Sequence, residues 1–235
     1  GFIDNTIKLN KSIFKVCDEP NGQVSEYWVK GLEKDGEAAT FTIVGSKSML
    51  TPLTGDIVEI NPDLPGEDDC NADNNKCRTI HAALSRMIPS LPKEAPKVIE
   101  LPANEISIYN EGICSTIPII GGISFEGKEE INNSGETIKT SIEASSMCRI
   151  FNCQDMQNTS VTIRNIEIKN GKALDGSNGG GILLNNCSPT LENVSITDNK
   201  SEGKGGGLYL VNNSNPLLKE VEITDNTSED NGGGL

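Results

Sequence analysis

Aromatic side chains, histidine and long apolar runs are what this sequence has least of. Phe, Trp and Tyr together make up 4 % of the 235 residues, and His81 is the only histidine. A core with few aromatic anchors must be filled by many Val, Ile and Leu side chains, and a single histidine argues against a histidine-based catalytic or zinc site. No run of about 18 apolar residues occurs, so the sequence predicts no membrane-spanning helix, and it shows no signal peptide.

Basic residues are also in short supply. Twenty Lys and Arg face 34 Asp and Glu, which gives a formal net charge of −14. Binding nucleic acid requires clustered basic residues, so we expect no such partner. The cysteines form no pair of Cys-x-x-Cys motifs, and neither a phosphate loop nor a zinc helix is present. We therefore expect no metal site, no catalytic residues and no cofactor.

Glycine and asparagine, by contrast, are abundant and recur at a fixed spacing. Glycine triplets begin at positions 179, 205 and 232, which are 26 and 27 residues apart, and each is followed by Ile or Leu. In phase with them, the heptapeptide 193–199 recurs 27 residues later as 220–226, and a looser copy covers 165–171. A repeat of about 27 residues is typical of solenoids.

Within each repeat, apolar residues alternate with polar ones. Val194 and Ile196 alternate with Asn193 and Ser195, which is the pattern of a short strand with one buried face. Such a unit is too small to bury its own apolar face and must stack on its neighbours. We expect the turn-forming residues to mark the corners of the coils, with calcium there as a minor alternative. The candidate corner residues are Gly179, Gly180, Gly181, Gly205, Gly206, Gly207, Asp198, Asn199, Asp225 and Asn226.

Upstream of the regular repeats the chain keeps short strand patterns and adds one helical one. Ile80, Ala83, Leu84, Met87 and Ile88 share one face of a helix predicted over 78–88. A single amphipathic helix ahead of a solenoid predicts a cap over its first coil, with His81 as a cap or surface residue. Residues 1–55 are predicted to be a small β-rich N-terminal segment or cap, with strands over 26–30 and 39–44 joined across 31–36.

The chain has seven cysteines, an odd number. Cys70 and Cys77 bracket a polar loop, and Cys148 and Cys153 bracket a short apolar one, so both spacings suit local disulfides. Disulfides indicate an oxidising compartment, and reduced buried thiols are the alternative. At least one cysteine is left free or paired outside this segment.

The segments Ile57–Pro62, Cys77–Leu84 and Val98–Pro102 resemble the first part of pectin-lyase-like right-handed parallel β-helix domains. The glycine triplets and the Ile-Thr-Asp-Asn elements are similar to the paired repeats of polymorphic outer membrane proteins, which read Gly-Gly-Ala-[Ile/Leu/Val] and Phe-x-x-Asn. Here Gly replaces Ala, and Ile196 and Ile223 replace Phe. The resemblance covers residues 56–235 and implies an all-β, right-handed parallel β-helix with the character of an autotransporter adhesin passenger.

Polysaccharide lyases and hydrolases also use this fold, so the enzyme alternative depends on residues. Arg149 and Arg164 are the only arginines past residue 100, and Asp198 and Asp225 occupy equivalent repeat positions instead of the unlike environments that split an acid/base pair. We expect a non-catalytic adhesin-type β-helix. The alternatives are a fragment of a polysaccharide lyase or glycoside hydrolase acting on acidic polysaccharide, and a structural stalk.

The expected partner is a host receptor, a glycan or a second copy of the chain, contacted through irregular insertions such as 127–139. We expect the protein at the cell surface, in the outer membrane or secreted. Both ends, Gly1 and Leu235, are interpreted as cuts from a larger protein, so membrane contact would come only through regions outside this segment.

Overall fold

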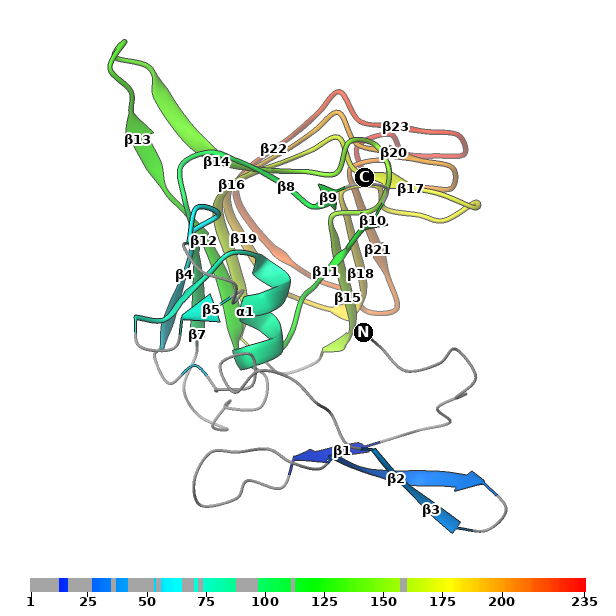
Figure 1. Cartoon of the computed structure of the whole chain (residues 1–235). Helices are drawn as coiled ribbons and strands as arrows, with labels where there is room; N and C mark the ends of the chain where they lie inside the picture. Colours follow the sequence, from blue (N-terminus) through cyan, green and yellow to red (C-terminus); the bar gives the residue numbers. More distant parts are fainter. Residues whose placement is uncertain are drawn as a thin grey trace.

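A computed structural model describes most of the chain. It covers residues 53, 56–64, 70–71, 74–87, 97–110, 113–156 and 160–235, and it gives the backbone alone for strands at 13–16, 27–34 and 37–41. The stacked coils drawn in Figure 1 form a parallel β-helix, so the predicted fold class is confirmed.

Each regular coil consists of two longer strands and one short strand. The first regular coil holds β15 (Phe151–Met156), β16 (Thr162–Lys169) and β17 (Lys172–Ala173). The second holds β18 (Ile182–Cys187), β19 (Thr190–Thr197) and β20 (Lys200–Ser201). The third holds β21 (Leu208–Val211), β22 (Leu217–Thr224) and β23 (Thr227–Ser228). Equivalent strands of successive coils pair in parallel.

The earlier coils are less regular but join the same sheets. Their elements are β4 (Ile57–Ile60), β5 (Cys70–Asn71), β6 (Lys76–Cys77), α1 (Ile80–Met87), β7 (Lys97–Leu101), β8 (Glu105–Ser107), β9 (Tyr109–Asn110), β10 (Ile113–Cys114), β11 (Ile117–Pro118), β12 (Ile123–Gly127), β13 (Glu129–Ile131) and β14 (Thr137–Glu143). The largest sheet has eleven strands and includes β7, β12, β16, β19 and β22, while β11-β15-β18-β21 and β17-β20-β23 form two other sheets of the coils.

The core is a set of apolar rows that run along the stack. One row contains, in register, Val58, Ile99, Phe125, Ile163, Leu191 and Leu218. All of these side chains except Leu218, in β22, are fully buried. Phe125 also meets Phe151 edge to face, at 5.3 Å between ring centres, and so joins two sheets across the core. Alternation along each strand thus places one set of side chains in the interior of the coils, where equivalent residues stack in rows.

The coils turn where single residues adopt left-handed backbone. Asn165, Asn193 and Glu220, at equivalent positions, have φ between 52° and 57°, and each bends a long strand of the eleven-stranded sheet. Asn and Asp tolerate this region better than other side chains. The bends let a strand of eight residues serve two faces of the coil.

Helix α1 covers the first coils, as the sequence predicts. It begins after Thr79, whose hydroxyl accepts the N–H of Ala82 at 3.1 Å, and it buries Ile80, Ala83, Leu84 and Met87 in the core. The imidazole Nε2 of His81 lies 3.1 Å from the carbonyl oxygen of Thr116. His81 therefore ties the cap to the chain ahead of β11. Ile88, the last residue of the predicted helical face, lies outside the described residues.

The N-terminal strands differ in extent from the prediction. β1 (Ile13–Val16), β2 (Tyr27–Lys34) and β3 (Glu37–Phe41) form an antiparallel sheet in the order β1-β2-β3. The predicted connection across 31–36 is too long, because β2 continues through Gly31 with a register shift between Trp28 and Glu33. The proposed domain boundary at residue 55 stays a prediction, since Leu53 is the only described residue between 42 and 55.

Candidate binding surface

The predicted corner glycines lie where the coils turn and touch. Gly179, Gly205 and Gly232 have φ between 61° and 70°, the region that favours glycine. A Cβ on Gly180 would overlap the carbonyl oxygen of Lys200, which lies in β20. The first glycine of a triplet therefore serves the turn, and the second serves close stacking. Both are roles in building the coil.

The predicted Asp-Asn corners separate into two different roles. Asp198 and Asp225 are exposed, with φ of 54° and 55°. Asn199 instead points into the coil, where it is fully buried. Its amide nitrogen donates to the carbonyl oxygens of Ile168 and Thr197, both at 2.9 Å, and its Oδ1 accepts the N–H of Gly171 at 2.8 Å. Asn226 repeats this arrangement one coil later, with its Oδ1 accepting the N–H of Asn199 at 2.9 Å. Buried Asn199 and half-buried Asn226 thus form a ladder that joins coils.

Three disulfides link described cysteines, and one predicted pairing is wrong. Cys70 and Cys77 are bonded across an antiparallel pair of short strands. Cys148 and Cys153 are not bonded to each other: Cys148 pairs with Cys114, and Cys153 with Cys187. Each of the last two pairs spans 34 residues in sequence. The reason is that successive coils lie side by side, so the nearest thiol lies one coil away. Cys17, the seventh cysteine, lies outside the described residues.

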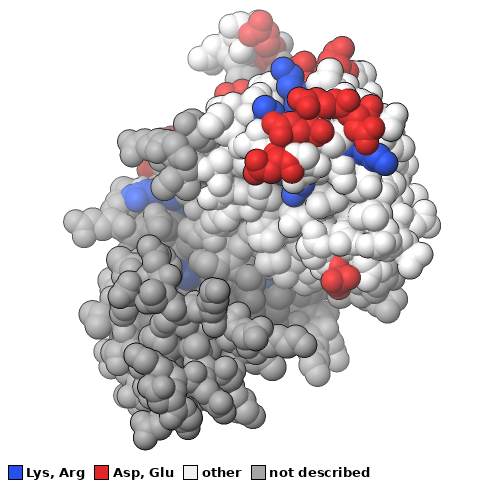
Figure 2. Space-filling view, turned by 90° about the vertical axis from the view of Figure 1, so that its right-hand side faces the viewer, with Lys and Arg blue, Asp and Glu red and all other residues white. Residues whose placement is uncertain are grey.

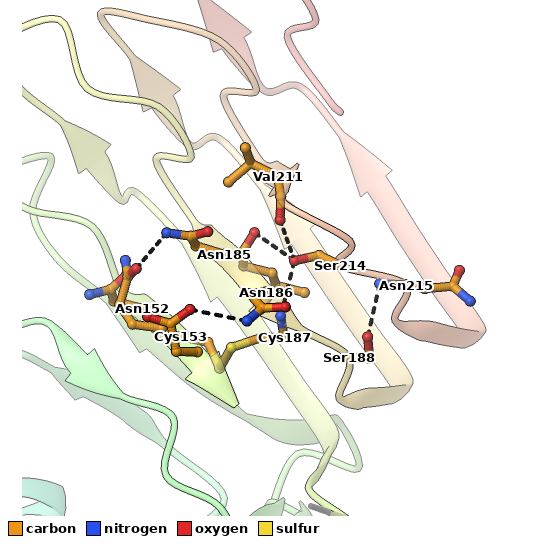
Figure 3. Close-up of a disulfide and its surroundings, with 12 residues drawn as sticks. Asn152, Cys153, Asn185, Asn186, Cys187, Ser188, Val211, Ser214 and Asn215 are labelled. Atoms are coloured by element: carbon orange, nitrogen blue, oxygen red, sulfur yellow. Dashed lines mark hydrogen bonds between the residues drawn. A yellow bond between two sulfur atoms is a disulfide. The ribbon is translucent and has the colours of Figure 1, made fainter. Parts of the chain in front are cut away.

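Figure 3 shows the Cys153–Cys187 disulfide between β15 and β18 with polar groups around it. The N–H of Cys187 donates to the hydroxyl of Ser214 at 3.1 Å, and that hydroxyl donates to the carbonyl of Val211 at 2.7 Å. On the outer surface, Asn185 donates to Gln154 at 2.7 Å and accepts from Asn212 at 2.8 Å. The disulfide therefore joins two of the three coils that the exposed amide ladder links.

The predicted irregular insertion over 127–139 is an ordered hairpin. β13 and the start of β14 pair antiparallel, with Glu129 opposite Lys139 and Ile131 opposite Thr137. Figure 1 shows this hairpin standing out from the stack. All three residues of β13 are exposed, and Ile131 keeps 75 % of its surface in contact with solvent. An isolated Ile at that exposure is the most prominent apolar group on the hairpin.

The tip of the hairpin is fixed by one asparagine. The Oδ1 of Asn132 accepts the N–H groups of Ser134 and Glu136, both at 2.9 Å, and its Nδ2 donates to the carboxylate of Glu136 at 2.9 Å. Gly135, at φ 84°, completes the turn. At the base, Lys139 pairs with Glu129 at 3.2 Å, and Lys128 pairs with Glu100 at 2.8 Å. Side-chain contacts therefore support the hairpin at both its tip and its base.

A row of ionisable side chains crosses the outer face of the eleven-stranded sheet. It contains, in register, Lys76, Glu59, Glu100, Glu126, Arg164, Glu192 and Lys219. Three glutamates stand next to one another in this row, where like charges repel. Each has a cationic partner: Lys76 lies 3.1 Å from Glu59, Lys128 lies 2.8 Å from Glu100, and Arg164 lies 2.6 Å from Glu126. The hydrogen bond to Glu100, and the charges of Glu100, Glu59 and Glu130, raise the pKa of Lys128.

Beside this row the sheet carries a shallow hollow of about 210 Å³, lined by Val98, Ser124, Phe125, Glu126, Thr162, Arg164 and Glu192. Arg164 is held there by Glu126. The other arginine past residue 100, Arg149, donates to the carbonyl oxygens of Gly179 at 2.8 Å and Asn178 at 2.6 Å. Burial lowers the pKa of Arg149. Both guanidinium groups thus have partners within the fold.

Acidic side chains gather on the side of the molecule that carries β17, β20 and β23 (Figure 2). The turns after these short strands contain Asp175, Glu202, Glu229 and Asp230. The backbone N–H of Gly176 and the ammonium of Lys172 lower the pKa of the Glu202 carboxyl. In the part of the chain that the structure describes, no group of three or more His, Cys, Asp or Glu is arranged to hold a metal ion. No helix among the described residues is long and apolar enough to span a bilayer.

The segment that runs from β19 to β21 is similar to a known protein family. The family model described as the Chlamydia polymorphic membrane protein repeat matches residues 193–210. The chain is a β-helix in which one segment is similar to the Chlamydia polymorphic membrane protein repeat. The match spans both elements of the predicted resemblance, Ile196–Asn199 and Gly205–Leu208. No curated protein and no solved structure matches the chain.

The geometry gives the residues of the two matched elements a role in this chain. The asparagine of the first element is the ladder residue, which is Asn199 in the matched coil and Asn226 in the next one. The third glycine of the first two triplets lies against such a ladder residue: a Cβ would lie 3.1 Å from Cγ of Asn199 if added to Gly181, and 2.8 Å from Cγ of Asn226 if added to Gly207. The segment that matches the family model thus contains residues through which the coils stack. Proteins named for this repeat are surface-associated proteins of the outer membrane.

The sequence did not predict the hairpin, the charged row or the Cys114 and Cys187 partners. For the disulfides a signal was present, because both pairs have the same separation of 34 residues. For the row, the signal was a charged residue at one outward position of each strand, which becomes visible only once the register is known.

Proposed function

We propose that this β-helix is a binding segment of a surface protein of the adhesin type, without catalytic activity, and that the β13–β14 hairpin makes its main contact with a partner. The observation that carries the proposal is the hairpin itself, which is ordered, stands out from the stack and exposes Ile131. The polymorphic membrane protein repeat supports a place at the cell surface. A stiff stack that is closed by disulfides is a suitable carrier for a protruding contact element.

The test compares the whole chain with a variant that lacks only the hairpin. Replacing residues 129–139 by Asn-Gly would close the ladder at Lys128 and Thr140, where the N–H of Thr140 already donates to the carbonyl of Lys128 at 3.1 Å. Both proteins are applied to cultured epithelial cells and to a glycan array. We expect the whole chain to bind and the shortened chain to lose most of that binding. Equal binding by both proteins would remove the hairpin from the proposal.

Polysaccharide cleavage is the second candidate function, because the hollow beside Glu126 and Glu192 lies on an open sheet face and contains carboxylates. Its test is digestion of acidic and neutral polysaccharides, with and without calcium, followed by new reducing ends and unsaturated products. We expect no turnover. Turnover that is lost in Glu126→Gln and Glu192→Gln would replace the adhesin proposal by an enzyme.

A further inference from the structure

The hairpin has an open strand edge. β13 pairs with β14 and has no second neighbouring strand among the described residues. Hydrogen-bonded and non-hydrogen-bonded pairs alternate along an antiparallel ladder. The N–H of Asn132 donates to the carbonyl of Glu136 at 2.9 Å, and the N–H of Thr140 donates to that of Lys128 at 3.1 Å. The backbone groups of Glu130 therefore face β14, whereas those of Glu129 and Ile131 face outward.

The negative charge of β13 favours some added strands over others. Two of the three residues of β13 are glutamates, and Glu130 forms no ion pair within 4 Å in the described part of the chain. A second copy of β13 would place glutamate against glutamate, which opposes self-pairing. A strand with a basic residue opposite Glu130 and an apolar residue opposite Ile131 would meet complementary groups on both faces of the hairpin.

We propose that β13 accepts an extended, basic segment of a partner protein as an added strand. The main-chain bonds would come from Glu129 and Ile131, while the carboxylate of Glu130 and the side chain of Ile131 would select the sequence. This inference rests on the proposed function of the hairpin and adds how the hairpin binds. The ordered tip at Asn132 holds the edge extended before a partner arrives, which reduces the entropy lost on binding.

The probe is a short fluorescent peptide of alternating Lys and Val, compared with a peptide of alternating Glu and Val, and binding to the whole chain is followed by anisotropy. We expect the basic peptide to bind at least about tenfold more tightly than the acidic one. Equal binding of both peptides, or no binding of the basic one, would overturn the proposal.

Two substitutions at one position separate strand addition from attraction by charge. Ile131→Pro removes an N–H that faces away from β14, so it keeps the hairpin and its charge while blocking the added strand. Ile131→Thr keeps the N–H and loses only the apolar contact. We expect affinity for the basic peptide to fall about tenfold in Ile131→Pro and less than about threefold in Ile131→Thr. Equal affinity in Ile131→Pro and the unaltered chain would show attraction by charge alone and would sink the idea.

Amide hydrogen exchange gives a readout that does not depend on the variants. On adding the basic peptide, the amides of Glu129 and Ile131 should gain protection, while that of Glu130 is already protected by β14. Protection that is unchanged at both positions would contradict an added strand. If the shortened chain loses cell binding but Ile131→Pro retains it, the hairpin remains the contact element and only strand addition is wrong.

Discussion

At the scale of single residues, buried and exposed amide ladders should contribute very differently to stability. Asn199 satisfies three backbone groups inside the coil, whereas Asn185 bonds two amides at the surface, where water can replace them. We expect Asn199→Ala to lower the free energy of unfolding by about 2–4 kcal/mol, because it leaves buried backbone groups without partners. Asn185→Ala, the matched control, should cost less than about 0.5 kcal/mol. Urea titration of both variants is the measurement, and equal midpoints would contradict the distinction.

The same residues show what sequence could predict at this scale. The Asp-Asn pairs, which were predicted to be corner residues, lie between β19 and β20 and between β22 and β23. Their division into an exposed left-handed Asp198 and an inward Asn199 was missed, because either residue suits either role. Asn199 is the residue that points inward because it can donate to the carbonyl oxygen of Ile168 in the preceding coil. This partner becomes known only with the fold.

At the scale of elements, the disulfides give a prediction that tests the order of the coils. Cleavage by trypsin after Lys139, Arg149, Lys172 and their neighbours places Cys114, Cys148, Cys153 and Cys187 on four separate peptides. Without reduction, we expect the peptide of Cys114 joined to that of Cys148, and the peptide of Cys153 joined to that of Cys187. A linked Cys148–Cys153 peptide would contradict the structure. The double variant Cys153→Ala, Cys187→Ala should lose about 2–4 kcal/mol of stability, a difference that reductant removes.

Regular elements were predictable and the hairpin was not, for a physical reason. Val194 and Ile196 alternate with polar residues because one face of β19 is buried, and that alternation is readable in the sequence. β13 buries nothing, so Glu129-Glu130-Ile131 carries no such alternation. Its pairing with β14 depends on the turn at Asn132. A stretch rich in Asn, Ser and Gly is compatible with many different turn conformations, so the sequence does not indicate this one.

At the scale of the whole molecule, the stacking of coils aligns equivalent side chains in long rows. Parallel register places the outward residues of seven strands side by side, from Lys76 to Lys219, although they are far apart in sequence. The same register aligns the apolar row from Val58 to Leu218. The period of the repeat was sufficient to predict stacking, but the irregular lengths of the earlier coils hid which charges would meet. The charged row is therefore a property of the fold that the repeat alone does not reveal.

The row supplies a prediction about pH. The folded state raises the pKa of Lys128, so it holds that proton more tightly than the unfolded chain does. The resulting stabilisation is complete below the unfolded lysine pKa of about 10.4 and is lost as pH rises through the higher value in the folded state. With 42 % of its side chain exposed, Lys128 should contribute less than about 1 kcal/mol.

Lys128→Met keeps most of the aliphatic stem and removes the charge that faces the stacked glutamates. We expect this variant to be less stable than the unaltered chain at neutral pH. The reason is that Glu59, Glu100 and Glu130 all attract the ammonium group of Lys128, and without it their mutual repulsion is no longer offset. The difference should shrink as pH rises above 10.4 and should also shrink at high salt, which screens the repulsion. Lys200→Met, at an exposed position away from the row, is the control and should show neither trend. A stability difference that stays constant across pH and salt would mean that Lys128 acts through packing of its aliphatic stem. Repulsion between the glutamates would then make no contribution to the effect.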